Sequence, residues 1–396
     1  MRPSKALLSV PLIAATLLAG CSSGAGPKSS ARGTTSTTAT STSTTTSSTT
    51  TTAPAGPAGG PVPSGFSPES VTYVSSTQAW VLGTAPCSTA PCTSLVRTRD
   101  GGASWKGVAA PSVVPAADPT GTSGVSRVRF ADPRDGWIFG PGLYSTHDGG
   151  SSWTSVTVPG APSGARVVSL AAGNGYAYLL VVPAQGAAGA GEVFRTGVGS
   201  DNWAPAGLTV AGADNGLVLV QGSSVWAVVV TTQGQTVLEG QSGGGWRKQA
   251  VPCSTPTLAW WAQSSSELAA VCGSGGAAGQ EVKEVYTSTD GGASFSRAGA
   301  APPGGDVGGL ALASPTTMVV SAASGASWLY ASFDGGASWS TVFTDSGSGG
   351  MPWYDLGFTT ASVGEVIEGD PGVRGLPSSR MLVTHDGGHT WAPQTF

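Results

Sequence analysis

Short runs of apolar, β-prone residues, separated by turns rich in Gly, Asp and Ser, recur from about residue 66 to the last residue of the chain. The second repeat is the clearest, with runs at residues 128–130, 137–139, 143–146 and 153–158. Runs of this length and composition, bounded by turn residues, are typical of short β-strands. The pattern therefore predicts an all-β domain in which each repeat contributes four strands.

One eight-residue segment marks the repeats. Thr-Arg-Asp-Gly-Gly-Ala-Ser-Trp at residues 98–105 returns with small changes at 146–153, 288–295, 332–339 and 384–391, and altered copies lie at 195–203 and 239–246. Asp-Gly-Gly between apolar runs favours a hairpin, because glycine takes positive φ without strain and the carboxylate accepts nearby backbone N–H groups. We expect structural roles for the carboxylates of these turns: Asp100, Asp148, Asp290, Asp334 and Asp386.

The aromatic residue that ends each copy recurs at steps of about 43 to 52 residues, seven times in all. A period of about 40 to 50 residues with four strands per unit is the signature of β-propeller blades. We therefore predict a single seven-bladed propeller of four-stranded antiparallel blades over residues 66–396. If the octet joins the third and fourth strands, it lies on the face opposite the loops that follow the second and fourth strands.

The octet resembles the Asp-box, or bacterial neuraminidase (BNR) repeat, whose pattern is Ser/Thr-x-Asp-x-Gly-x-Thr-Trp/Phe. Residues 130–140 (Phe-Ala-Asp-Pro-Arg-Asp-Gly-Trp-Ile-Phe-Gly) and 73–83 resemble blades of photosystem II stability and assembly factor-like propellers. The second resemblance implies a scaffold for a protein partner. Sortilin-type and sialidase-type propellers share the box, so it implies a fold and no single activity.

The N-terminus predicts export. Arg2 and Lys5 precede an apolar run over residues 6–19, as in a signal peptide. Residues 18–21, Leu-Ala-Gly-Cys, resemble a bacterial lipobox, which implies removal of residues 1–20 and lipid anchoring of Cys21 at the outer face of the cell membrane. An ordinary cleaved signal is the alternative. Residues 21–65, dominated by Thr, Ser, Pro, Gly and Ala, predict a disordered linker, either a plain spacer or a carrier of O-linked sugars.

Charge limits the partners of the predicted propeller. Four of the 18 basic residues and none of the 22 acidic ones precede residue 66, so the propeller has a net charge of −8. An acidic domain without a basic stripe is a poor nucleic-acid binder. We expect a monomer that uses no cofactor, no metal and no nucleic acid.

Four cysteines remain beyond Cys21, an even number in an exported chain, which favours disulfides. Three pairings are formally possible. In the blade arrangement Cys87 and Cys92 share one loop between the second and third strands, while Cys253 and Cys272 flank the first two strands of the fifth blade on one face. We therefore predict the pairs Cys87–Cys92 and Cys253–Cys272.

Propellers usually present ligands at the mouth of the central channel, here the face opposite the octet turns. The candidate binding residues that the predicted loops and strand starts place there are Arg127, Arg166, Trp353, Tyr354, Asp355, Asp370 and Arg374. For Trp353 and Tyr354, stacking on a sugar or a peptide competes with packing between blades. The insert carrying Asp370 and Arg374 is either a binding loop or a tolerated insertion.

Two enzymatic alternatives involve the same face. A sialidase-like site needs an arginine triad, a tyrosine nucleophile and acidic partners, and the spacing of Arg127, Arg166 and Arg374 matches none specifically. A two-carboxylate glycosidase needs only acids, with Asp355 and Asp370 as first candidates. The three histidines all fall inside octet turns, which leaves no raw material for a Ser-His-Asp triad or a histidine metal site. We expect a non-catalytic binding or assembly platform for a protein or glycan, with a cell-envelope glycoside hydrolase as the alternative.

Overall fold

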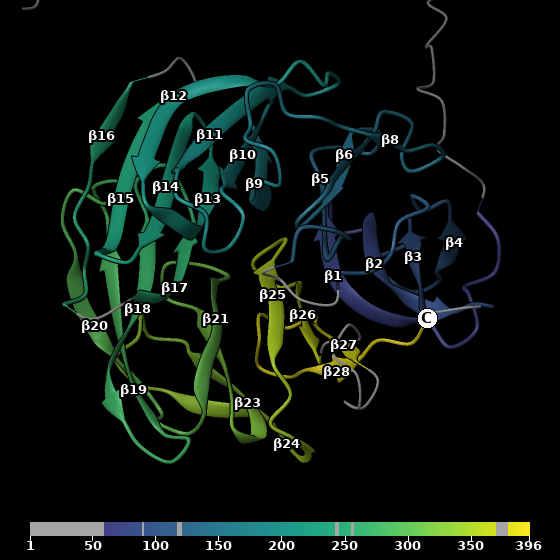
Figure 1. Ribbon diagram of the computed structural model, residues 1–396. Coiled ribbons are helices and arrows are strands. Elements are labelled where there is room, and N and C mark those ends of the chain that lie inside the picture. Colours follow the sequence, from purple (N-terminus) through teal and green to yellow (C-terminus); the bar gives the residue numbers. More distant parts are fainter. Residues whose placement is uncertain (1–58, 89–90, 117–120, 242–244, 255–256, 370–378) are drawn as a thin grey trace, which may run out of the picture. The chain divides into compact units, whose positions relative to one another are not determined.

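The computed structural model describes residues 59–396 except 89–90, 117–120, 242–244, 255–256 and 370–378. These residues form seven antiparallel sheets of four strands each, and within every sheet consecutive strands pair in chain order. Each sheet is one blade (Figure 1). The prediction of a seven-bladed all-β propeller is confirmed. The proposed signal peptide, Cys21 and residues 22–58 of the predicted linker lie outside the described residues. The last residues of that linker, 59–65, are described, and Gly60 pairs with Gly107 of blade 1 through two backbone hydrogen bonds.

Strand length differs among the first three blades: the strands have 2 to 4 residues in blade 2 and 7 or 8 in blade 3. They are β1 (Ser67–Tyr73), β2 (Ala79–Pro86), β3 (Pro91–Thr98) and β4 (Lys106–Val108); β5 (Arg127–Phe130), β6 (Gly136–Phe139), β7 (Leu143–Thr146) and β8 (Thr154–Ser155); and β9 (Arg166–Gly173), β10 (Tyr176–Val182), β11 (Ala190–Gly197) and β12 (Ala204–Ala211).

Blades 4 to 7 follow the same order. Their strands are β13 (Ala213–Gln221), β14 (Ser224–Thr231), β15 (Gly234–Gln241) and β16 (Trp246–Lys248); β17 (Thr257–Ala262), β18 (Leu268–Gly276), β19 (Glu281–Ser288) and β20 (Ser296–Ala301); β21 (Asp306–Leu312), β22 (Met318–Ala323), β23 (Gly325–Ser332) and β24 (Ser340–Gly349); and β25 (Trp353–Phe358), β26 (Gly364–Glu368), β27 (Arg380–Thr384) and β28 (Ala392–Pro393).

The first strands of neighbouring blades contact one another all the way round, and β25 of blade 7 contacts β1 of blade 1 (Figure 1). Blades 1 and 7 each take all four strands from one continuous stretch of chain, so no strand is exchanged at this seam. Side chains close it instead. The ring of Phe396 packs against Phe66 and Trp105, and the Gln394 side-chain amide donates to the carbonyl of Gly102 (3.0 Å).

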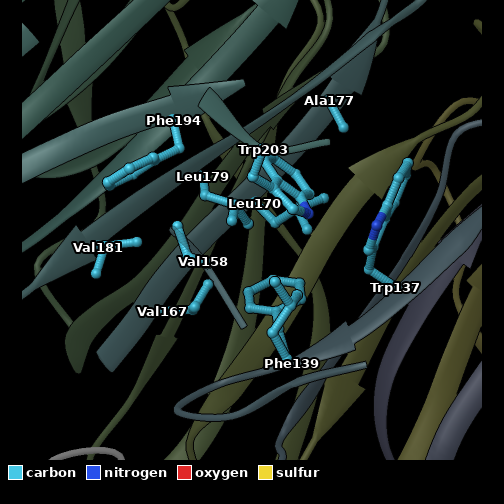
Figure 2. Packing of buried hydrophobic residues seen from close by; sticks show 11 residues of the cluster. Trp137, Phe139, Val158, Val167, Leu170, Ala177, Leu179, Val181, Phe194 and Trp203 are labelled. Carbon is cyan, nitrogen blue, oxygen red and sulfur yellow. The ribbon is translucent and has the colours of Figure 1, made fainter. Parts of the chain in front are cut away.

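Apolar side chains alternate along the inner strands and fill the spaces between blades. Between blades 2 and 3, Trp137 and Trp203 meet edge to face with ring centroids 6.2 Å apart, beside Phe139, Leu170 and Leu179 (Figure 2). Each of these side chains is buried. Similar clusters occur between other pairs of blades, so burial of apolar surface between sheets is what holds the propeller together.

The octet forms a closed hairpin tip. In the first copy, the Thr98 hydroxyl donates to Asp100 (2.7 Å) and accepts the N–H of Gly102 (2.9 Å). The Asp100 carboxylate also accepts the N–H (2.9 Å) and hydroxyl (2.5 Å) of Ser104. The same bonds recur around Asp148, Asp290, Asp334 and Asp386. Gly101 and Gly102 have φ of 72° and 93°, which only glycine adopts without strain.

The octet also ties its hairpin to the rest of the blade. In all five regular copies, the first glycine donates its N–H to a carbonyl of the loop between the first and second strands, at 2.8 to 2.9 Å. The pairs are Gly101 with Thr77, Gly149 with Arg134, Gly291 with Ser266, Gly335 with Thr316, and Gly387 with Ser362. The two loops that the repeat pattern assigned to one face are therefore bonded to each other.

These bonds predict a stability that depends on pH in acid. Hydrogen bonds from the Ser four residues later lower the pKa of Asp100, Asp290 and Asp334 to about 2. A carboxyl whose folded pKa is depressed contributes stability that is present above its unfolded pKa and is lost as pH falls through the folded pKa. We expect the urea midpoint to fall between pH 4 and pH 2. A variant with all three residues changed to Asn should show a flatter profile, and an equally steep one would contradict this assignment.

A hydrogen bond from a buried tryptophan to an octet carbonyl joins some neighbouring blades. The buried indole N–H of Trp226 in blade 4 donates to the carbonyl of Gly291 in the octet of blade 5 (3.0 Å), and Trp80 of blade 1 donates to Gly149 of blade 2 in the same way (3.3 Å). Trp137 occupies this position in blade 2, but the octet of blade 3 is an altered copy and the Trp137 indole N–H has no partner. The altered sequence therefore costs blade 2 one hydrogen bond.

Replacing these tryptophans by phenylalanine isolates what the hydrogen bond between the indole and the octet carbonyl contributes to the free energy of unfolding. Trp226→Phe and Trp137→Phe remove the same ring volume from fully buried positions, but only Trp226→Phe breaks a hydrogen bond and leaves a carbonyl unpaired. We expect Trp226→Phe to cost about 1 kcal/mol more in the free energy of unfolding than Trp137→Phe. Chemical denaturation of both variants measures the difference. Equal losses would show that the hydrogen bond of Trp226 contributes nothing to stability.

Both predicted disulfides are present. Cys87–Cys92 lies at the turn between β2 and β3, and Cys253–Cys272 joins the segment before β17 to β18. The Cα atoms are 5.8 Å and 5.5 Å apart. The pairing followed from placing both cysteines of each pair on one face of a blade, and the strand register confirms that placement, since Thr257 at the start of β17 lies opposite Cys272.

Candidate functional site

A cavity of about 520 Å³ opens on the face opposite the octet turns. It is formed where blades 2, 3 and 4 meet, by the starts of their first strands and by the loops after the second strands of blades 2 and 3. The residues that line it are Ser126, Arg127, Gly140, Arg166, Val167, Val168, Gln185, Gly186, Asp214, Asn215 and Val230. Arg127 and Arg166, predicted to bind ligand from their positions at strand starts, thus line one cavity.

Arg127, at the start of β5, lies between the cavity and blade 7. Its guanidinium stacks over the ring of Tyr354 at 4.7 Å from the centroid, a cation–π contact that joins blade 2 to blade 7. One guanidinium nitrogen donates to the carbonyl of Ser126 (3.1 Å). Within the described part of the chain, no carboxylate forms a salt bridge with Arg127. The Arg127 guanidinium is therefore positioned by the ring of Tyr354 and the carbonyl of Ser126.

Arg166, at the start of β9, is 5% exposed. Its guanidinium donates to the carbonyls of Asp214 (2.9 Å) and Pro183 (3.4 Å), which belong to blades 4 and 3. These two bonds orient the guanidinium of Arg166 at the cavity. Arg166 therefore lines the cavity in a fixed position from blade 3, whereas Arg127 lines it from blade 2.

Asp355, the first candidate for a catalytic carboxylate, is built into the seam of the ring. Its side chain is 8% exposed and pairs with Arg129 of β5 (2.6 Å). It also accepts the hydroxyl of Ser70 (2.5 Å) and the backbone N–H of Val71 (3.0 Å). Burial alone would raise the pKa of Asp355, but the charges of Arg129 and Arg127 and these hydrogen bonds hold it below its usual value. The carboxylate is thus ionised and fully bonded.

Asp355 accepts a backbone N–H from the first strand of the neighbouring blade, that of Val71. Between other blades a serine hydroxyl accepts the corresponding N–H. The hydroxyl of Ser70 accepts the N–H of Val128 in the next blade (3.1 Å), and the hydroxyl of Ser169 accepts that of Val218 (3.0 Å). Between blades 7 and 1 the carboxylate of Asp355 accepts this hydrogen bond and pairs with Arg129 as well. The backbone of Asp355 has φ 49°, a left-handed conformation that Asp adopts more readily than most residues.

Glu365, in β26, is a second buried carboxyl near this pair. Burial and then the charge of Asp355 raise the pKa of Glu365 well above its usual value. Two carboxyl groups with opposite shifts are what an acid–base pair requires. Here, however, Asp355 is engaged by Arg129, Ser70 and Val71, and Glu365 is 7% exposed beside Gly357, whose missing side chain leaves it room.

The remaining predicted site residues do not join the cavity. Trp353 is 3% exposed, and its indole N–H donates to the carbonyl of Ala322 (2.9 Å), so its position fits packing between blades 6 and 7. Tyr354 is not among the lining residues and touches the site through its contact with Arg127. Asp370 and Arg374 lie outside the described residues.

Arg129 was missed by sequence reasoning, although a signal was present. It lies two residues after Arg127 in a four-residue strand, and residues at that spacing share one face of a strand. The pair therefore points to a cationic face on β5 near the channel.

Among the described residues, no cluster of three or more His, Cys, Asp or Glu side chains has the arrangement of a metal site. The described part of the chain likewise holds no helix with the length and apolar character needed to cross a membrane.

Comparison with known proteins supports the fold alone. No family model and no curated protein matches the chain. Among solved structures, YCF48 bound to a D1 peptide aligns over 82% of this chain and 95% of its own, with 19% identity and a TM-score of 0.56. YCF48 from Cyanidioschyzon merolae aligns over 82% and 97%, with 17% identity and a TM-score of 0.55. A prolyl endopeptidase aligns over 82% and 49%, with 10% identity and a TM-score of 0.52. The resemblance to assembly-factor-like propellers thus holds at the level of fold.

Proposed function

We propose that this chain is a non-catalytic binding protein that presents the channel face of its propeller to a segment of a protein partner. The observation that carries the proposal is the cavity of about 520 Å³, whose arginines are oriented in advance by Tyr354, Pro183 and Asp214. Pre-oriented polar groups in a concave site are what binding needs. YCF48, a protein of similar fold, binds a D1 peptide, which supports a peptide as the occupant.

The surroundings of Asp355 support binding rather than hydrolysis at this carboxylate. A nucleophilic or general-base carboxylate must reach substrate, whereas Asp355 has both oxygens engaged by protein groups. A cell-envelope glycoside hydrolase remains the alternative function. The predicted export signal and the lipobox-like residues 18–21 further lead us to propose that the protein is anchored at the outer face of the cell membrane, with the predicted linker 21–65 as the tether.

A cavity-blocking variant tests the proposed binding. Gln185 is an exposed lining residue, and Gln185→Trp fills the cavity without changing its charge. We expect the full chain to bind members of an immobilised peptide array and the variant to lose them. Glycans as the only ligands lost in the variant would instead favour a glycan partner, and no ligand lost in the variant would contradict the proposal.

An activity screen tests the alternative. We expect the full chain to hydrolyse neither xyloglucan nor sialyl-lactose. Hydrolysis that disappears in Asp355→Asn would establish the glycoside hydrolase and overturn the proposal of a non-catalytic role.

A further inference from the structure

We propose that a second cavity, next to the one between blades 2, 3 and 4, receives a large apolar side chain of the bound peptide. The inference rests on the proposed function and adds the kind of residue that the peptide must carry. This second cavity, here called the apolar cavity, has a volume of about 300 Å³ and lies where blades 2 and 3 meet. It is lined by residues 141–143 and 156–158 from blade 2, by residues 161–165 between the blades, and by Val167 and Val181 of blade 3.

The apolar cavity adjoins the larger one. Val167, the second residue of β9, lines both cavities. In the loop after β6, Gly140 lines the larger cavity and the next residue, Pro141, lines the apolar one. The N–H of Val167 donates to the carbonyl of Pro141 (3.0 Å), so these two boundary residues are bonded to each other across the blades. An extended peptide advances by about 3.3 to 3.6 Å per residue, so a short segment is enough to reach from one cavity into the next.

The lining of the apolar cavity favours an apolar ligand. All of its lining residues belong to the described part of the chain, and none of them has a charged or aromatic side chain. Four of them are aliphatic residues of the core cluster between blades 2 and 3, each 3% to 8% exposed: Leu143, Val158, Val167 and Val181. Water in such a cavity finds few hydrogen-bond partners, so an apolar group that displaces it gains the free energy of apolar burial. A sugar would find no aromatic ring to stack on.

The rim of the apolar cavity is ordered by turns that the sequence specifies. Pro159 and Gly160 form the centre of one turn, with φ of 83° at the glycine, as in a type II turn. It is closed by the N–H of Ala161, which donates to the carbonyl of Val158 (3.2 Å). A second turn spans residues 162–165 and is closed by a hydrogen bond between its end residues (3.0 Å). Because the rim is ordered by its own bonds, a side chain that enters the cavity meets little entropic cost from the protein.

The occupant of the apolar cavity has to come from outside the chain's own linker. Residues 22–58 contain no Val, Ile, Leu, Met, Phe, Tyr or Trp, so this stretch of the predicted linker has no large apolar side chain to insert. A partner's peptide that lies across the larger cavity supplies one at the adjoining position. The two cavities then form one peptide site, in which the apolar cavity determines which residue is accepted.

Positional-scanning libraries of N-acetylated, C-amidated hexapeptides test the apolar cavity on the full chain. Each library has one position fixed as Leu, Val, Asn or Glu and mixtures at the others, and the peptides retained by the immobilised protein are quantified. We expect one position at which retention is at least about tenfold higher for Leu or Val than for Asn, because burial of two CH₂ groups already accounts for about tenfold.

Two variants alter the apolar cavity alone. Thr157 is an exposed lining residue that does not line the larger cavity, so Thr157→Asp places a charge in the apolar cavity and leaves its neighbour intact. Ala161→Leu fills the apolar cavity from the rim with a neutral side chain. Either change should abolish the preference for Leu and Val and leave retention of the Asn library unchanged. Thr341→Asp, at an exposed threonine of β24 in blade 6, is the matched control and should keep the preference.

The outcomes separate this inference from the proposed function. Peptides that are retained without preference for an apolar residue, and lost in Gln185→Trp, would overturn the apolar cavity and leave the peptide-binding cavity standing. A preference that Thr157→Asp and Ala161→Leu leave unchanged would place the apolar residue elsewhere and would also overturn the inference. Retention of no peptide would overturn both proposals. A dimer of the full chain in sedimentation velocity that Ala161→Leu dissociates would make a second copy the occupant, against the inference.

Discussion

Replacing Arg129 by methionine is expected to destabilise the propeller by about 3 kcal/mol at neutral pH. The change leaves Asp355, with 8% of its side chain exposed, without its cationic partner. Removing one member of a buried ion pair typically costs about 3 to 5 kcal/mol, and Arg129 is 32% exposed, which places the estimate at the low end. The measurement is the free energy of unfolding from urea denaturation. The loss should shrink towards pH 4, because in the variant burial without Arg129 raises the pKa of Asp355 and the carboxyl becomes protonated.

Two variants control this experiment. Arg297→Met breaks the exposed pair with Glu284 (3.0 Å), which should cost at most about 1 kcal/mol. Asp355→Asn keeps an oxygen for the N–H of Val71 and tolerates φ 49°, so it should cost less than Arg129→Met. If Arg129→Met is no more damaging than Arg297→Met, the seam does not depend on this pair.

The seam also shows where sequence reasoning ends. Asp355 meets Arg129 and Val71 across 226 and 284 residues of chain. Its sequence neighbourhood suggested only a carboxylate near the channel, which is why it was a catalytic candidate. The ring brings together blades 1, 2 and 7, and only that closure shows that its charge is already used.

The blades, in contrast, were predictable because their signals are local. The octet closes with bonds between residues two to four positions apart, as between Thr98, Asp100 and Ser104, so a short segment specifies the hairpin wherever it lies. Five such hairpins and two altered copies at blade spacing then fix the architecture, and the disulfide pairs follow from it.

The altered copies mark an intermediate case. In blade 3 the Thr196 hydroxyl donates to the carbonyl of Ser200 (2.9 Å), so that turn closes without an octet carboxylate. Asp201 instead accepts the Ser145 hydroxyl of blade 2 (2.6 Å), and the ring nitrogens of His147 face Asp135 (2.6 Å) and Asp201 (3.3 Å). The sequence placed these residues in turns, but the contact between blades 2 and 3 depends on a register that no local pattern specifies.

Removing the disulfide Cys253–Cys272 is expected to cost more stability than removing Cys87–Cys92. The two bridges span 19 and 5 residues of chain. In the chain-entropy account a bridge stabilises by restricting the unfolded chain, which gives about 3 kcal/mol for the longer loop and about 2 kcal/mol for the shorter. Position acts in the same direction, because Cys272 is buried in β18 whereas the shorter bridge lies at a hairpin end.

Double Cys→Ala variants of each pair, compared by urea denaturation, measure the two effects, and the unmodified chain under reducing conditions should lose about as much as both variants together. The contributions should add, because the bridges lie in blades 1 and 5, which are not neighbours in the ring. A larger loss from the Cys87/Cys92 variant would show that loop length does not govern the effect. The β2–β3 hairpin would then depend on its bridge for folded-state geometry rather than for restriction of the unfolded chain.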